Sequence, residues 1–276
     1  MLNLFGWLSP RLGRSLRLGI APDGLALVRT SMWPHERAQL LGQVRCGGAD
    51  PASIGVALAM LLGEHASAGQ AVTVVLSDEL VRLWQVTPPA GASRMADLQG
   101  AAALRFQALF GAAPGRWKIG ADWDAARPFL ASAVPQALLD TLAAAARTYR
   151  FHLVEIVPQF VAALNQHRKA RRPGAWFGLV HGGVLSVAAF DGKLLAAVRT
   201  TLIPDGADRD WLESHVAREA LRVGLGRPER LQVSGPAPMG WASSAGRLKF
   251  ACTLLEDELD ALWPDSARLA MTGRAP

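Results

Sequence analysis

The stretch Trp176–Thr200 decides the fold and reads WFGLVHGGVLSVAAFDGKLLAAVRT. Three apolar runs are separated by two short turns, at His181-Gly182-Gly183 and at Asp191-Gly192. Glycine adopts positive φ without a Cβ penalty, so both turns favour β-hairpins. We therefore predict three short antiparallel strands. These strands are too apolar for a sheet with one solvated face, so we expect helices to cover them.

The same pattern occurs once before, near the N-terminus. Strands are expected over 16–20, 25–30 and 39–45, with a turn at Ala21-Pro22-Asp23-Gly24. A helix and one more strand follow each triplet. Asp50 and Pro51 are typical of a helix start before a strand over 71–77, and Asp208 or Asp210 can cap a helix before a strand over 230–234. A repeated βββαβ order restricts the fold to a duplicated α/β unit.

The remaining elements follow from periodicity and turn residues. We expect strands over 81–87, 116–122, 129–134, 151–157 and 248–253, and helices over 95–110, from 135, over 160–168 and over 254–263, with a tail after that. Arg171-Arg172-Pro173-Gly174 is the best domain boundary. We therefore predict an N-terminal segment (1–15), a first domain (16–172) with an inserted subdomain at about 81–125, and a shortened second domain (173–276).

Composition narrows the class of protein. The chain has 276 residues, half of them hydrophobic, which suits two domains with real cores and argues against disorder. Cys46 and Cys252 lie far apart, and buried free thiols are favoured over a disulfide. The sequence contains no apolar run of about 18 residues and no convincing signal peptide. We therefore expect a cytoplasmic protein.

The net charge of +6 is unevenly distributed. A basic run covers 167–172, and three arginines follow an apolar N-terminal segment. Either these are solvated charges or they attract an anionic surface. The N-terminal segment either contacts a membrane or docks on its own domain. The residues that would contact a membrane are Leu4, Phe5, Trp7, Arg11, Arg14 and Arg17. No aromatic residue is interleaved to stack bases, which disfavours nucleic acid.

Motifs for common chemistries are missing from the sequence. Its six histidines and two cysteines show no His-x-x-x-His or Cys-x-x-Cys spacing, so no metal site is predicted. The segment 183–186 lacks the second glycine of a nucleophile elbow, and no Walker lysine motif occurs. Asp122 and Asp124 read as surface carboxylates. No enzyme class is indicated.

Five short stretches, in their order along the chain, resemble a known family. They are Leu4-Phe5 before Leu18-Gly19-Ile20, the strand Val72–Leu76, Ala131–Pro135, Val154–Pro158 and Leu231–Gly235. Together with the doubled strand triplets, they resemble the actin-like (ribonuclease H-like) ATPase fold. Within that fold the chain is similar to PilM-type proteins of the type IV pilus inner-membrane platform. The cytosolic domain of type II secretion L proteins is a close second.

The resemblance implies a two-domain fold of repeated βββαβα units with a nucleotide site between the halves. The corresponding residues here are Gly19, Ala21, Asp23, Gly24, His181, Gly182, Gly183, Ser234 and Gly235. The acidic positions of the two phosphate loops fall on Ala21 and His181, so Mg²⁺ would be held by phosphate oxygens and water alone. ATP would bind weakly at best and would not be hydrolysed, so we expect a pseudo-ATPase with degenerate loops and no certain cofactor.

The resemblance also implies a partner. A short cytosolic peptide of a PilN-type single-span membrane protein would dock against the inserted segment, with Trp84, Leu98 and Phe106 as walls. Helix spacing explains the last two as ordinary core too, and for any one of the three a core position is favoured. The protein would be a non-catalytic scaffold, peripheral on the cytosolic face of the inner membrane, and self-association is left open. The alternative is an active ATPase or small-molecule kinase of the same fold. A nucleic-acid binder of the ribonuclease H-like fold is disfavoured because no carboxylate cluster is visible.

Overall fold

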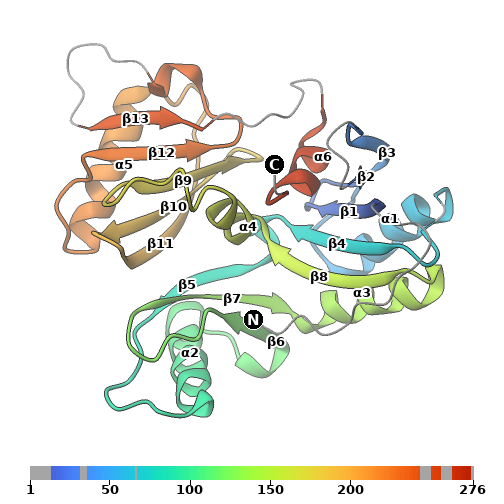
Figure 1. Ribbon diagram of the computed structural model, residues 1–276, viewed down its shortest axis with the longest axis horizontal. Helices are drawn as coiled ribbons and strands as arrows, with labels where there is room; N and C mark the ends of the chain where they lie inside the picture. The colour runs from blue at the N-terminus through green and yellow to red at the C-terminus, as the bar shows by residue number, and fades with distance from the viewer. Residues whose placement is uncertain (1–13, 32–35, 66, 243–249, 256–262, 275–276) are drawn as a thin grey trace.

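The structure is a computed structural model that describes residues 14–31, 36–65, 67–242, 250–255 and 263–274. Two five-stranded sheets lie beside each other, and a smaller three-stranded sheet lies next to both (Figure 1). Each large sheet joins an antiparallel strand triplet to two parallel strands. The duplicated βββαβ order predicted from the sequence is confirmed.

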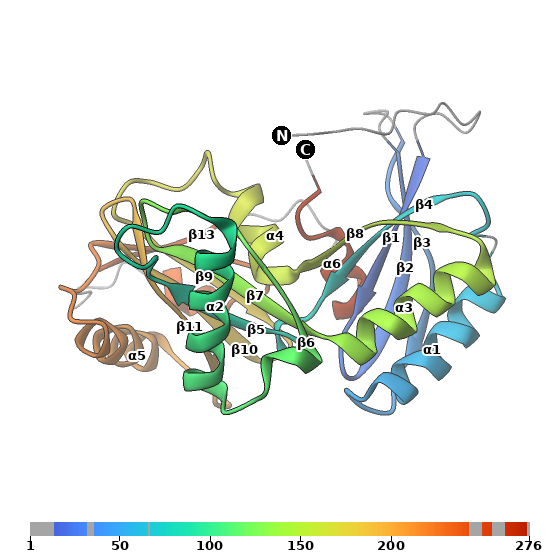
Figure 2. The ribbon, with the colours of Figure 1, turned by 90° about the horizontal axis from the view of Figure 1, so that it is seen from below.

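The first sheet has the strand order β3-β2-β1-β4-β8. Its strands are β1 (Arg14–Ile20), β2 (Gly24–Ser31), β3 (Gln39–Arg45), β4 (Ala71–Leu76) and β8 (His152–Pro158). Helices α1 (Pro51–Gly63) and α3 (Gln136–Tyr149) lie side by side on one face (Figure 2). Asp50 caps α1 as expected, because its carboxylate accepts hydrogen bonds from the N–H groups of Ala52 and Ser53.

The second sheet repeats this layout in the order β11-β10-β9-β12-β13. It consists of β9 (Trp176–His181), β10 (Val184–Asp191), β11 (Leu194–Leu202), β12 (Arg230–Ser234) and β13 (Ala251–Leu254). Every residue of β9 is buried, as its apolar sequence predicts. Helix α4 (Gln159–Gln166) and helix α5 (Arg209–Arg222, capped by Asp208) both contribute to the core of this sheet.

The third sheet, in the order β5-β7-β6, belongs to an insertion between β4 and α3. It contains β5 (Arg82–Val86), α2 (Met95–Phe110), β6 (Trp117–Ala121) and β7 (Phe129–Pro135), with short 3₁₀ turns η1 (Asp78–Leu80) and η2 (Pro114–Arg116). The predicted hairpin of β6 and β7 is confirmed. The sheet includes β7, so the insertion extends beyond the limit that we predicted at residue 125.

The C-terminal region differs from the prediction. We expected a helix over 254–263 followed by a tail, and residues 256–262 lie outside the described part of the chain. After them comes a further helix, α6 (Asp265–Met271), which returns to the first sheet and packs on β1 and β2. The boundary at 172 stays a prediction, but 265–271 lie on the first sheet and not on the second.

Side-chain alternation along β1 explains how α6 fits. Leu16, Leu18 and Ile20 join the core beneath α1 and α3, so the residues between them face the opposite side. On that side a Cβ added to Gly19 would lie 2.1 Å from the carbonyl oxygen of Ser266. Glycine is therefore required at position 19 to let the backbone of α6 approach the strand.

Arg17 lies on the same side of β1 as Gly19. Its guanidinium donates hydrogen bonds to the carbonyl oxygens of Ala270 (2.5 Å) and Thr272 (2.6 Å) at the end of α6. A cation at a helix C-terminus stabilises the unpaired carbonyl groups there. The prediction that Arg17 contacts a membrane is therefore wrong. Arg14 begins β1, and Leu4, Phe5, Trp7 and Arg11 lie outside the described residues.

Cys46 and Cys252 are free thiols, as expected, but both are half-buried and not buried. None of the helices that the structure describes is long and apolar enough to cross a membrane.

The α6 contact yields a stability prediction. Replacing Gly19 with alanine should lower the free energy of unfolding by about 1–3 kcal/mol, because the new methyl group collides with backbone that cannot rotate away. Gly100 is the control: it lies inside α2 with no atom within 4 Å of an added Cβ, and Gly100→Ala should be neutral or slightly stabilising. Urea unfolding of both variants measures the difference. Equal effects would show that α6 does not pack closely on β1.

Candidate functional site

The first candidate site lies between the two large sheets, where β9 and β10 line a small cavity and the charge of Asp23, in the β1–β2 turn, acts on His181 at the end of β9. In the first turn, the N–H of Ala21 donates to the carbonyl of Gly24 (2.9 Å), and the N–H of Gly24 donates back (3.3 Å). Ala21 is buried against Val75 of β4 and Leu269 of α6. The position where the family implies an acid is therefore occupied by an apolar side chain in a small core.

The second turn has the predicted glycine geometry. Gly182 and Gly183 adopt φ values of 56° and 76°. A two-residue type I′ hairpin turn requires positive φ at both of its central residues. His181, just before them, is buried. Burial lowers the pKa of His181, although the nearby carboxylates of Asp265 and Asp23 act in the opposite direction. The imidazole is therefore uncharged at neutral pH and supplies no negative charge for Mg²⁺.

Two glycines of the predicted nucleotide site have another role. The space beside Gly19 is occupied by α6, and a Cβ added to Gly235 would lie 2.1 Å from the carbonyl oxygen of Val180 in β9. Both glycines thus permit close contact within the protein itself. The hydroxyl of Ser234 is also engaged, 3.1 Å from Nε2 of His167. Of the predicted set, Gly183 is the glycine with no atom within 4 Å of an added Cβ.

Asp78 is a cleft residue that sequence reasoning missed. It lies in η1, directly after β4, and its carboxylate accepts hydrogen bonds from the N–H of Phe160 in α4 (3.0 Å) and the hydroxyl of Ser186 in β10 (3.2 Å). It therefore joins the end of β4 to the second sheet. Burial raises the pKa of Asp78 to about 7, against the opposing effect of both hydrogen bonds. A sequence signal for this residue was present, because the two acids Asp78 and Glu79 follow a buried strand almost directly.

A small polar cavity of about 10 Å³ lies beside Asp78. Gln159 and His181 line it, and the side-chain oxygen of Gln159 is buried without a hydrogen-bond partner among the described residues. The other end of the Gln159 amide donates to the hydroxyl of Thr272, just after α6 (3.3 Å). This volume suits about one water-sized group. The cavity itself has no room for a phosphate chain.

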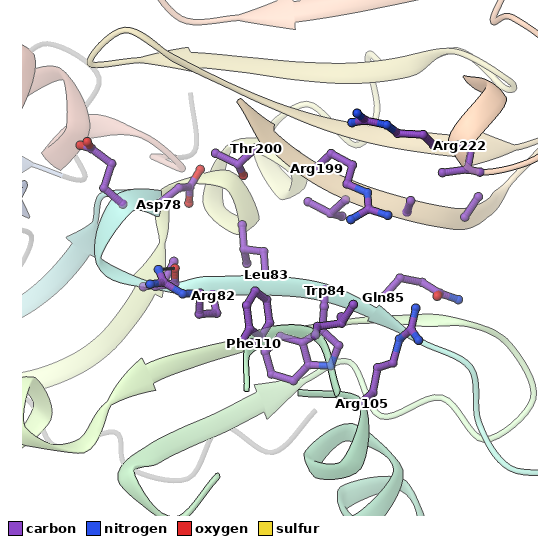
Figure 3. A pocket seen from close by; sticks show the side chains of 17 residues that line it. Asp78, Arg82, Leu83, Trp84, Gln85, Arg105, Phe110, Arg199, Thr200 and Arg222 are labelled. Atoms are coloured by element: carbon purple, nitrogen blue, oxygen red, sulfur yellow. Dashed lines mark hydrogen bonds between the residues drawn. The ribbon is translucent and has the colours of Figure 1, made fainter. Parts of the chain in front are cut away.

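The second candidate site is a groove of about 520 Å³ between β5 of the insertion and β11 of the second sheet (Figure 3). It is lined by Asp78, Glu79, Val81, Arg82, Leu83, Trp84, Gln85, Arg105, Leu109, Phe110, Ala196, Ala197, Val198, Arg199, Thr200, Arg222 and Val223. Pockets of this size accommodate small molecules or a few residues of a peptide.

One of the three predicted groove residues lines this groove. Trp84 does so, although it is only 2% exposed, and its indole N–H has no acceptor among the described residues. Leu98 and Phe106 are 4% and 0% exposed and pack in the core of the insertion. Their prediction as groove walls is therefore wrong, because their helical spacing reflects core packing. Sequence reasoning missed Leu109 and Phe110, which stay partly exposed at the rim.

Asp78 yields a prediction about pH. Its raised pKa means that the folded protein binds more protons than the unfolded chain between about pH 4 and 7, so the unfolding free energy falls as pH rises through that window. The slope from one group is at most about 1.4 kcal/mol per pH unit. Asp78→Asn cannot ionise, so its stability relative to wild type should rise from pH 4 to pH 7.

Chemical unfolding across this pH range measures the difference. Asp205→Asn, which removes an exposed carboxylate of the second half, is the matched control for the loss of one carboxyl group. A pH-independent difference for Asp78→Asn would contradict the burial of an ionisable carboxyl at this position.

The chain is similar to several solved structures. No family model matches the sequence, and none of the curated proteins matches it. The cytoplasmic domain of EpsL, an inner-membrane component of the type II secretion system of Vibrio cholerae, matches with a TM-score of 0.60 at 13% identity, over 94% of each chain. The PilM–PilN type IV pilus biogenesis complex matches with a TM-score of 0.58 at 18% identity, over 96% of this chain and 95% of that chain.

A third solved structure, from Bacteroides thetaiotaomicron, is described as having an actin-like ATPase fold and unknown function. It matches with a TM-score of 0.59 at 9% identity, over 88% of this chain and 91% of that chain. At such identities the likeness concerns the fold and not the activity. The chain therefore has the two-domain actin-like ATPase fold, as the sequence resemblance to PilM-type proteins implies.

Proposed function

We propose that this protein is a cytosolic scaffold in the inner-membrane platform of a type IV pilus or a type II secretion system. The support is the fold, because the structural match covers nearly all of this chain, of the EpsL domain and of the matched chain of the PilM–PilN complex. Ala21 and His181 occupy the two phosphate-loop positions where the resemblance implies acids, which agrees with a role other than catalysis. The protein would lie at the cytosolic face of the inner membrane, held mainly by a membrane-protein partner.

The groove between β5 and β11 is the proposed binding site for the partner. The observation that carries this proposal is a groove with partly exposed apolar residues, Leu109 and Phe110, at its rim and Trp84 in its wall. Aromatic residues in partly enclosed sites are typical anchors for a bound segment. The bound segment would be a short cytosolic peptide of a PilN-type single-span membrane protein.

The scaffold would be non-catalytic. Ala21 is apolar and buried, and His181 is uncharged at neutral pH, so neither can organise Mg²⁺ and its waters. Loss of that positioning removes several kcal/mol of possible transition-state stabilisation. ATP could still bind weakly through the open turn at Gly183, without being turned over.

The partner proposal predicts a difference between two leucines of α2. Leu109 lines the groove and is 40% exposed, whereas Leu104 is 70% exposed and does not line it. Leu109→Ala should weaken binding of the partner's leader peptide about tenfold, equivalent to about 1.4 kcal/mol, through lost apolar contact. Leu104→Ala should bind as wild type. Isothermal titration calorimetry with a synthetic leader peptide measures the affinity of both variants. Equal affinities would show that the peptide does not bind in this groove.

The pseudo-enzyme proposal predicts no ATP turnover. Phosphate release by the purified full-length protein with Mg²⁺ should equal that of a buffer blank, and Gly183→Ala should not change it. Turnover that is present in wild type and lost in Gly183→Ala or Asp78→Asn, with both variants folded by circular dichroism, would instead support an active ATPase or kinase that works in the cleft.

A further inference from the structure

A short basic loop, residues 167–172, connects α4 to β9 and lies outside the groove between β5 and β11. Gln232 of β12, which is only 4% exposed, holds this loop in place. Its side-chain oxygen accepts a hydrogen bond from the N–H of Arg172 (2.8 Å), and its amide group donates to the carbonyl oxygen of Ala170 (3.1 Å). Both polar groups of a buried side chain are therefore bonded to the basic loop, which fixes the loop backbone relative to the second sheet.

The charged side chains of the basic loop have no acidic partners close by. Arg168, Lys169 and Arg172 are exposed, and none of them has a carboxylate at ion-pair distance among the residues that the structure describes. The carboxylate of Asp122 interacts with Arg168 only at longer range. Like charges held on one short loop repel one another, so an anionic partner would stabilise this arrangement.

A hollow of about 600 Å³ lies beside the basic loop. The start of β9, the end of β10 and the turn between α5 and β12 surround it. Three arginines line it, Arg172, Arg227 and Arg230, together with two acids, Asp191 and Glu229. A hollow of this size accommodates a small ligand. The excess of arginines favours a ligand that carries phosphate, because the planar guanidinium matches phosphate geometry.

The basic loop lies on the same side of the molecule as the start of β1, the upper side in Figure 2. β1 begins at Arg14, so the N-terminal segment 1–13 is attached on this side. Contact with a membrane is one of the two roles that the sequence predicts for that segment, whose apolar residues include Leu4 and Trp7. Helices α1 and α5 lie on the opposite, lower side (Figure 2). Two features that suit an anionic membrane therefore share one side.

The surroundings of the basic loop favour lipid over nucleic acid. The guanidinium of Arg171 lies 4.2 Å from the ring centroid of Phe190, and that ring is only 8% exposed. Proteins that bind single-stranded nucleic acid stack its bases on accessible aromatic rings, and this ring is covered. An anionic lipid surface requires only clustered positive charge at the right side of the protein.

Resting on the proposed function, which places the protein at the cytosolic face of the inner membrane, we propose that the basic loop and the hollow beside it form the surface that contacts anionic lipid headgroups. Lys169 and Arg172 pair with headgroup phosphates at the membrane surface. Arg172, Arg227 and Arg230 bind one headgroup phosphate in the hollow. This contact turns the start of β1 toward the bilayer.

Cosedimentation of the full-length protein with vesicles tests this surface. The vesicles contain phosphatidylcholine alone, or phosphatidylcholine with about 30% phosphatidylglycerol. Lys169→Glu combined with Arg172→Glu reverses two exposed charges of the basic loop. The matched control is Arg116→Glu combined with Lys118→Glu, which reverses two exposed charges in η2 and in β6, a strand in the lower half of Figure 2.

The wild-type protein should bind the anionic vesicles but not the neutral ones, with an affinity that falls as salt increases. The loop variant should bind the anionic vesicles about tenfold more weakly, and the control variant should bind them as wild type does. Lys169→Gln combined with Arg172→Gln, which only removes the charges, should give a smaller loss. Unchanged binding of the loop variant, or equal weakening by loop and control variants, would overturn the proposal.

Two competitors distinguish the lipid surface from other anions. Inorganic phosphate, added at constant ionic strength, should not release the protein from anionic vesicles. Its release would assign the hollow to a soluble phosphate compound and would overturn the lipid surface. Tighter binding to single-stranded RNA than to anionic vesicles, with the same dependence on Lys169 and Arg172, would overturn it in favour of nucleic acid.

The outcomes also separate this inference from the proposed function. If the leader peptide binds in a way that depends on Leu109, and vesicle binding does not depend on the basic loop, the scaffold stands and the lipid surface is wrong. If vesicle binding depends on the basic loop and the leader peptide does not bind, the lipid surface stands and the assigned partner is wrong.

Discussion

The packing of α6 on β1 is the contact on which the relation between the two halves depends. It is possible because position 19 is glycine, so that the backbone of Ser266 lies where a side chain would otherwise be. Arg17 then closes the end of the helix with two hydrogen bonds to its last turn. The last described helix thus completes the core over the first strand. The first sheet cannot bury both of its faces until nearly the whole chain has been added.

The same helix also contacts α4, which connects the two halves. Close to Gly273, which follows α6, lies Ala162 of α4, so the two helices that connect the halves meet there. The N–H of Gly273 donates to Gln166, and Gln159 donates to Thr272. The turns and glycines at the cleft are largely engaged in such internal contacts. An arrangement of this kind supports the proposal of a scaffold with a fixed relation between its halves.

The position of the groove follows from the contacts of Asp78. Asp78 lies where the chain leaves β4 for the insertion, and its bond to Ser186 attaches that point to β10, the neighbour of β11. β5 begins four residues later, so its edge is held beside the edge of β11. Side chains of both strands line the groove that is proposed as the partner's binding site.

Local patterns in the sequence determined the elements and their order. Strand alternation, the glycine turn at 182–183 and the caps Asp50 and Asp208 act over a few residues, and the structure has them where the sequence indicates them. The tertiary structure alone decided which long-range contacts form. Arg17 read as one of three basic residues and is instead bonded to residues more than 250 positions away, and Leu98 and Phe106 read as walls and are core. Asp78 became a cleft residue only when β10 and α4 approached it. Such roles depend on what packs opposite a side chain, and local periodicity contains no information about that neighbour.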